Sequence, residues 1–530
     1  MANEHKPSFV GGAAVLALAV AVTKVLGAIY KIPLGNLLDK EGMAHFYVAY
    51  NIYSLLLILS TAGLPLALSR LVSQAHALGR ENQKRRVFGV AATIFLAIGL
   101  VCGGAMLLFP EWLANVLHDS LAAPAIRALS PSVLCVCLLS AIRGYTQGQG
   151  NMKPTAASQI IESGCKLVVG LTLAWALLRA GRPSHEAAAG AIVGVTAGSA
   201  LSLVVLGLYL LRRPRARKGT DVPQSRCAIA GELLRIGLPV TVGAGGMSFI
   251  TLLDQMLVMS TLQDTLGLSE GAATALYGEY TFGMTLFHLP SSFIYPISIS
   301  LIPTISAAQA RGERESARSQ TETAFRVTAL LALPAGVGLS VLAGPILDFL
   351  YPAVPETAAA AACHLSVLGI ACIFVCLMVM TGGVLQAYGH EYIPVLSLFC
   401  GGALKVVTNY LLVADPEVGI RGAAVGTLCC YVLITLINLM AIHRLIPRRP
   451  DYFAVFFHPV LATAAMAVVA RGSWSLLDRL TDGSRVAVPA AIVLAAAVYG
   501  MAALFLGVIR RQDLLALPKG EKIADILRIH

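Results

Sequence analysis

Long apolar stretches recur from one end of the chain to the other. Each is close to the roughly 20 residues that a helix needs to cross a bilayer. The chain has 530 residues, 57% of them hydrophobic and 13% charged, and its mean hydropathy is +0.76. A backbone in lipid must satisfy its own hydrogen bonds, and in stretches of this length it does so as a helix. The sequence therefore predicts an all-α integral membrane protein.

About 14 apolar segments can be drawn, which predicts a multi-pass protein. Their approximate spans are 9–34, 44–69, 87–109, 122–142, 155–178, 188–211, 232–260, 274–305, 324–348, 358–388, 393–414, 420–442, 453–470 and 486–509.

The two halves of the chain repeat one another. Gly190-Ala-Ile-Val-Gly194 recurs as Gly422-Ala-Ala-Val-Gly426, and Lys166 and Lys405 occupy equivalent positions. Segments 1–6 and 7–12 are then two copies of one six-helix unit, and both copies start in the same direction because six is even. Parallel repeats of this kind predict an N lobe and a C lobe around a central cavity. Segments 13 and 14 are two extra helices at the C-terminal end.

Lysine and arginine set the expected orientation, because basic residues gather on the cytoplasmic side of membrane proteins. The basic segments fall on one side when the N-terminus and the C-terminus are both cytoplasmic. The net charge of +11 is therefore explained by topology and by contact with membrane lipids, not by nucleic acid. The expected domains are the N lobe (1–211), a basic cytoplasmic linker (212–231), the C lobe (232–445), segments 13 and 14 (446–509) and a basic cytoplasmic tail (510–530).

The first apolar segment carries two lysines. Lys24 and Lys31 are nearly two helical turns apart and share one face. A charge in hydrocarbon costs about 2.5 to 3.5 kcal/mol on insertion scales, so this face is predicted to line a water-filled, cationic cavity. Two alternatives stay open: Lys24 pairs with an acid, and Lys31 extends to the membrane surface.

Two further lysines lie inside apolar segments. Glu162 precedes Lys166 by four residues, the favourable order for a helical ion pair. The two side chains either neutralise each other or place Lys166 in the cavity, with Glu162 modulating it. Lys405 has no acid four residues before it, which makes it a better cavity candidate unless it pairs across the two halves.

Other polar residues inside the segments are candidates for gating or ion binding. Asp254 and Glu279 are lone acids, and each is either an ion or proton site or the counter-ion of a lysine. Asn51 and Tyr50 either line the cavity or join helices by hydrogen bonds.

Enzyme motifs are absent from the sequence. It contains no HExxH, no GxSxG and no P-loop, and the segments expected outside carry only scattered acids, whereas a metal-dependent transferase needs them clustered. We therefore expect a transporter without a cofactor, driven by Na⁺ or H⁺ coupling or by the membrane potential.

Four motifs carry a resemblance to a known family: Thr23–Pro33, Gly63–Arg70, Arg143–Gly148 and Pro154–Glu162. With them the chain resembles the polysaccharide-export branch of the multidrug/oligosaccharidyl-lipid/polysaccharide flippase superfamily. Within this branch it is most similar to the MurJ-like lipid II flippases and to the stage V sporulation protein B group. The resemblance covers all the segments and both lobes.

The resemblance implies a function in the bacterial cytoplasmic membrane. The protein would act as a monomer and would flip a polyprenyl-diphosphate-linked oligosaccharide by alternating access. Lipid II is the substrate that the resemblance favours most. Its headgroup would enter the cationic cavity while its tail rides a groove by segments 13 and 14. Lys24 matches a family arginine, and Lys31 stands one position beyond a second one. A third family arginine has no counterpart here, since Leu56 and Leu57 occupy that region.

The resemblance also implies a cation site. Asp254, Asn409 and Thr427 look like members of a sodium site of the family. Val413 stands where the family has an aspartate, so the expected site is incomplete.

Three other functions remain open. The first is a flippase for another lipid-linked polysaccharide, and the second is a cation-coupled multidrug exporter of the same superfamily. The third, of another class, is a polytopic enzyme acting on polyprenyl-linked sugars. A vegetative role and a sporulation role are equally compatible with the sequence.

Overall fold

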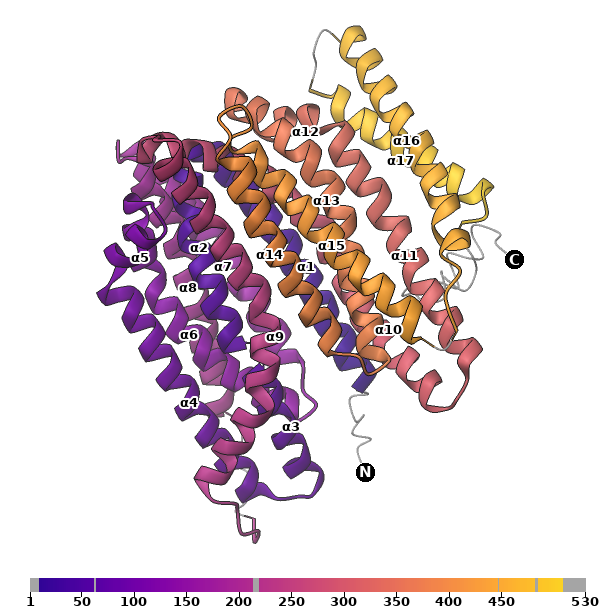
Figure 1. The fold of residues 1–530 in the computed structure, drawn as a ribbon. Coiled ribbons are helices and arrows are strands. Elements are labelled where there is room, and N and C mark those ends of the chain that lie inside the picture. Colours follow the sequence, from indigo (N-terminus) through magenta and orange to yellow (C-terminus); the bar gives the residue numbers. More distant parts are fainter. Residues whose placement is uncertain (1–8, 62, 213–218, 447, 482–484, 509–530) are drawn as a thin grey trace. The chain divides into compact units, whose positions relative to one another are not determined.

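The computed structural model describes residues 9–61, 63–212, 219–446, 448–481 and 485–508 (Figure 1). Over these residues the chain is helical, with connecting turns and loops, which confirms the predicted all-α class. The chain divides into two compact units, Met1–Gly278 and Glu279–His530. The division falls within the helix Glu270–Ala310, so the preceding helix, Arg226–Ser260, belongs to the first unit. The lobe boundaries expected from the linker stay a prediction.

In the described residues of the first unit, nine α-helices and two short turns precede α10. The helices are α1 (Phe9–Leu37), α2 (Lys40–Thr61), α3 (Gly63–Ala77), α4 (Glu81–Leu108), α5 (Pro110–Val116), α6 (Ala123–Gly148), α7 (Lys153–Arg179), α8 (Ser184–Arg212) and α9 (Arg226–Ser260). The turns are η1 (Ser120–Ala122) and the π-helical η2 (Thr261–Thr265).

The second unit starts within α10 and continues to the end of the described residues. Its helices are α10 (Glu270–Ala310), α11 (Arg314–Val341), α12 (Ala343–Leu350), α13 (Pro355–Ala387), α14 (Tyr392–Val413), α15 (Arg421–Leu445), α16 (Tyr452–Leu480) and α17 (Ala487–Phe505).

Each predicted apolar segment overlaps a helix, but the boundaries differ in places. The predicted segment 44–69 falls on both α2 and α3, α11 begins ten residues earlier than predicted, and α16 ends ten residues later. Within the described part of the chain, 11 helical stretches are long and apolar enough to cross a membrane. The chain is therefore a multi-pass membrane protein. The count of 14 spans and the parallel lobes stay predictions.

Close backbone packing joins α7 to α8. Gly190, Gly194 and Gly198 follow one another at intervals of four and therefore lie on one face of α8. A Cβ on Gly194 would overlap the backbone of Gly170 in α7, and a Cβ on Gly198 would lie 2.6 Å from the carbonyl oxygen of Glu162. Small residues are what allow helix backbones to approach this closely in a membrane.

The corresponding glycines pack α15 against α14 in the second unit. A Cβ on Gly422 would lie 2.7 Å from the Cβ of Leu412, and a Cβ on Gly426 would overlap the amide oxygen of Asn409. The recurring sequence therefore makes the same kind of contact in both units.

The last two helices form a hairpin that packs on α11. Their shared core contains Met466 and Ala470 of α16 and Ala495 of α17. The Tyr499 hydroxyl of α17 donates a hydrogen bond to the carbonyl oxygen of Leu330 in α11, at 2.9 Å. This bond anchors the hairpin to the second unit.

The packing of α8 predicts opposite effects for two glycines of that helix. Gly194→Ala should lower the free energy of unfolding by about 1 to 3 kcal/mol, because overpacking forces the backbones apart. Gly207→Ala meets open space and adds helix propensity, so it should be neutral or stabilising. Thermal unfolding of the purified variants in detergent measures both effects. Equal midpoints for the two variants would contradict the close α7–α8 contact.

Candidate functional site

Lys31, near the end of α1, lies against two tyrosines of α2. Its ammonium donates a hydrogen bond to the Tyr47 hydroxyl at 2.9 Å. The same nitrogen lies 4.5 Å from the centre of the Tyr47 ring and 5.7 Å from the centre of the Tyr50 ring. Rings at these distances attract a cation through their negative faces. Lys31 is therefore held by phenols inside the first unit.

Lys166 of α7 lies between two rings as well. Its ammonium is 4.7 Å from the ring centre of Tyr30 and 4.6 Å from that of Tyr50. The Tyr50 ring thus contacts both lysines. We call Lys31, Lys166, Tyr30, Tyr47 and Tyr50 the lysine–tyrosine cluster.

The rings of the cluster are fixed by packing. The fully buried Tyr30 donates a hydrogen bond from its hydroxyl to the carbonyl oxygen of Ala191 in α8, at 3.0 Å. Gly170 makes room for it, because a Cβ there would lie 3.0 Å from the Tyr30 ring. Phe46 stacks on Tyr50 with ring centres 5.6 Å apart. The aromatic walls are therefore in place before any ligand arrives.

Glu162 is paired with Arg143 of α6 and not with Lys166. The guanidinium donates to the Glu162 carboxylate at 2.9 Å and to the Ser158 hydroxyl at 2.9 Å. This pair connects α6 to α7. Over the part of the chain that the structure describes, no carboxylate lies within 4 Å of the ammonium of Lys31 or Lys166. The cluster therefore keeps two positive charges without an acidic partner.

Asn51 connects two helices of the first unit. Its amide nitrogen donates to the side-chain oxygen of Gln255 in α9, at 2.6 Å. Of the two interpretations offered by the sequence, this contact supports the helix-joining one.

In the second unit the predicted residues Asn409 and Thr427 lie on neighbouring helices. Asn409 of α14 is fully buried beside Gly426, which precedes Thr427 in α15. The Thr427 hydroxyl donates to the carbonyl oxygen of Ala423 at 2.8 Å and lies 3.1 Å from the Tyr280 hydroxyl. The Thr427 and Tyr280 hydroxyls are close enough to share a hydrogen bond.

The other predicted residues are spread over both units. Lys405 of α14 is buried, whereas Glu279 of α10 is partly buried. Asp254 is buried in α9 of the first unit, so the predicted sodium site draws on both units and stays a prediction. The backbone of Lys24 belongs to α1, and its side chain lies outside the described residues.

Tyr50 was a candidate to line the cavity, whereas Tyr30, Tyr47 and Arg143 were not predicted as site residues. Tyr47 and Tyr50 are three residues apart, which places both phenols on one helical face. These two tyrosines lie in the helix that follows Lys31 in the sequence. Their spacing was the feature from which their contact with the lysine could have been predicted. The partner of Glu162 lies 19 residues before it, where no local pattern points to it.

The comparisons with known proteins agree with this architecture. The solved structure of the lipid II flippase MurJ in its inward closed conformation matches with a TM-score of 0.71 over 93% of this chain and 98% of that one, at 15% identity. Stage V sporulation protein B of Bacillus subtilis is 26% identical over 97% of this chain and 98% of its own length. Lipid II flippase MurJ of the same organism is 25% identical over 82% of each chain.

The fold and these relatives define a membrane transporter of the superfamily that includes flippases and drug exporters, and not an enzyme. The family described as polysaccharide biosynthesis protein matches residues 9–309, more than half of the chain, and the MatE family matches residues 247–411. The chain belongs to the polysaccharide biosynthesis protein family.

The Arg143–Glu162 pair predicts a non-additive effect on stability. Both side chains are largely buried, with 12% and 22% exposed. Arg143→Met should therefore cost about 3 kcal/mol of unfolding free energy, because it leaves a carboxylate unpaired. The double variant Arg143→Met, Glu162→Met should cost clearly less. Thermal unfolding of the two single variants and the double variant gives the coupling, and simple additivity would contradict a structural ion pair.

Proposed function

We propose that the chain flips a polyprenyl-diphosphate-linked oligosaccharide, with lipid II as the first candidate, across the bacterial cytoplasmic membrane. It would act as a monomer by alternating access, with both termini in the cytoplasm. Membership of the polysaccharide biosynthesis protein family supports the substrate class. The names of two relatives, a lipid II flippase and a sporulation protein, support lipid II as the first substrate to test.

The lysine–tyrosine cluster is the observation that carries the proposal. A diphosphate needs cations in a partly dry site, where charge pairing is stronger than in bulk water. Lys31 and Lys166 supply two partly buried ammonium groups in the first unit, and among the described residues both contact tyrosine rings and no carboxylate. If a carboxylate were paired with the ammonium, a phosphate would have to displace it before binding. A tyrosine ring holds the ammonium more weakly, so the lysine can move from the ring to the phosphate.

The strengths of the two interactions favour this exchange. A cation–π contact contributes about 0.5 to 2 kcal/mol, and a charge-assisted hydrogen bond to phosphate is shorter and stronger than a neutral one. An arriving phosphate can therefore draw the ammonium off the Tyr50 ring. Lysine acts here as a flexible point charge, without the two-pronged geometry of arginine.

The substrate tail needs an apolar path outside the cationic site. The α16–α17 hairpin exposes large apolar side chains, among them Val468, Val493 and Phe505. This is the region that the resemblance assigns to the polyprenyl chain, and the proposal places the tail there.

Removing charge from the cluster should abolish flipping. The protein is expressed in a bacterium whose own lipid II flippase can be switched off, and growth and lipid II on the outer leaflet are followed. Lys31→Met and Lys166→Met should each lower rescue at least tenfold, since a phosphate contact is lost. Lys24→Met is tested beside them. Lys153→Met removes an exposed charge from the same helix as Lys166 and should rescue normally.

Other results of this experiment would change the assignment. Full rescue by Lys166→Met would contradict a role of the cluster in binding. No rescue by the wild-type protein, present in the membrane, would favour another lipid-linked polysaccharide. Export of cationic dyes on expression would favour a multidrug exporter, and a covalently changed substrate would favour an enzyme.

We also propose that a cation gradient or the membrane potential drives the cycle. If Na⁺ is the ion and Asp254, Asn409 and Thr427 bind it, replacing Na⁺ by choline should slow flipping in vesicles of the wild-type protein. Asp254→Asn should then be slow in both salts. A wild-type rate that is equal in both salts and falls when the potential is collapsed would point to the potential instead.

A further inference from the structure

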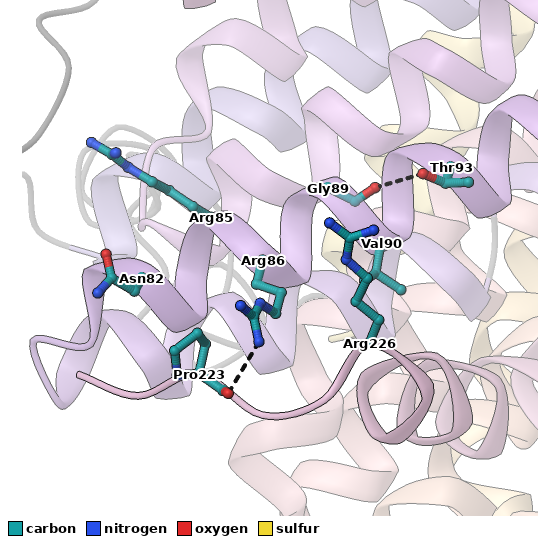
Figure 2. Close-up of a pocket in the computed structure, with 8 residues that line it drawn as sticks. All are labelled: Asn82, Arg85, Arg86, Gly89, Val90, Thr93, Pro223 and Arg226. Atoms are coloured by element: carbon teal, nitrogen blue, oxygen red, sulfur yellow. Dashed lines mark hydrogen bonds between the residues drawn. The ribbon is translucent and has the colours of Figure 1, made fainter. Parts of the chain in front are cut away.

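A pocket opens beside the first turns of α4, built from elements other than those of the lysine–tyrosine cluster. Its volume is about 650 Å³. One wall is α4, and the other is the end of the linker with the start of α9 (Figure 2). Its lining residues are Asn82, Arg85, Arg86, Gly89, Val90, Thr93, Pro223 and Arg226. Three of these are arginines and none is acidic.

The wall formed by the linker is tied to the start of α4. The Asp221 carboxylate accepts hydrogen bonds from the backbone N–H groups of Asn82 at 3.0 Å and Gln83 at 2.8 Å. The side chains of Gln83 and Gln224 are joined at 2.9 Å. These contacts hold the linker against α4 and keep the pocket formed.

The pH dependence of this contact follows from Asp221. Partial desolvation raises the pKa of its carboxyl, but the backbone hydrogen bonds from Asn82 and Gln83 outweigh it, and the pKa lies below its ordinary value. The contact is therefore fully present above the ordinary pKa of aspartate and is lost only as the pH falls through the lowered value. At neutral pH the carboxylate is ionised and engaged by the backbone.

Arginines approach the pocket from both walls. Figure 2 shows Arg86 on α4 and Arg226 at the start of α9, while Arg85 extends outward from α4. Arg86 uses Nη1 to donate to the carbonyl oxygens of Pro223 at 3.3 Å and Gln224 at 3.1 Å. A guanidinium has five N–H donors, so the remaining donors of Arg86 can bind a ligand. Guanidinium groups placed in this way fit the oxygens of a phosphate.

Gly89 lines the pocket and carries no side chain that would occupy the space beside it. A Cβ built on this residue meets nothing within 4 Å. The Thr93 hydroxyl one turn later donates to the Gly89 carbonyl oxygen at 3.0 Å, so it turns back onto its own helix. The lining therefore offers positive charge at one end and an apolar surface around Val90.

The same face of α4 continues as an exposed apolar stripe. Leu96 and Leu100 follow Thr93 along the helix, one turn apart, and are 40% and 56% exposed. At 1.5 Å per residue, Leu100 lies about 20 Å along the axis from Arg86. The α4 helix is one of the stretches long and apolar enough to cross a membrane. In a bilayer it would place this stripe at the depth of the lipid chains and the arginines near the headgroups.

We propose that this pocket binds the headgroup of an anionic glycerophospholipid, with one acyl chain along the Leu96–Leu100 stripe. Arg86 and Arg226 contact the phosphate, and Arg85 adds positive charge at the rim. The lipid would lie against both α4 and the linker end and would brace one on the other. This site goes beyond the proposed function and does not depend on it.

The test uses the full-length protein in detergent, titrated with phosphatidylglycerol and read by native mass spectrometry. Arg226→Gln should weaken binding about tenfold or more, because a charged hydrogen bond to phosphate is lost. Gly89→Trp keeps all three arginines but fills the hollow, and it should abolish the tightest binding. Phosphatidylcholine should bind weakly to every variant.

Two matched controls separate the pocket from general effects. Lys153→Gln removes one exposed positive charge elsewhere, and Gly104→Trp adds the same bulk to α4 where a Cβ also meets open space. Both should bind phosphatidylglycerol like the wild type. Unchanged binding by Arg226→Gln and by Gly89→Trp would overturn the proposal. Equal competition by inorganic phosphate or glycerol 3-phosphate at the same concentrations would overturn the lipid assignment in favour of a soluble phosphate compound.

Discussion

The close approach of α7 and α8 is the contact on which the first unit depends. Gly170 and Gly194 bring the two backbones together, and Gly170 also leaves the space that the Tyr30 ring fills. The Tyr30 hydroxyl is then bonded to α8, and its ring face lies under Lys166. A packing contact between small residues thus determines where a charged side chain rests. In lipid, where apolar burial gives helices little reason to associate, this packing is a main source of their specificity.

The sequence predicts the helical class and the positions of the helices because these depend on local properties. Apolar length and the absence of charge are enough to locate α4, α13 or α15, and the spacing of Gly190 and Gly194 already indicates a packing face. The two lysines of the cluster were also predictable, since a charge in an apolar segment demands an explanation. The tyrosine rings around each lysine were not predictable in the same way, because they belong to other helices.

Glu162 illustrates where local reasoning stops. Its spacing from Lys166 suggests an ion pair, and in an isolated helix that pair would form. In the folded unit a guanidinium from α6 reaches the same carboxylate and adds a bond to Ser158. Arg143 has separate N–H donors for the carboxylate and the serine, and it takes the place of the local lysine. The Asn51–Gln255 bond, which spans 204 residues, is beyond local patterns for the same reason.

The ring contacts of Lys166 have a consequence for turnover. A carrier must release its cargo as readily as it takes it up, so a very deep binding well would trap it. Tyr30 and Tyr50 lie against the ammonium, so under the proposed function release of the substrate would return the lysine to these rings and not to a bare cavity. Loading and unloading would then exchange one partner of the ammonium for another. Such a site favours repeated cycles over tight retention.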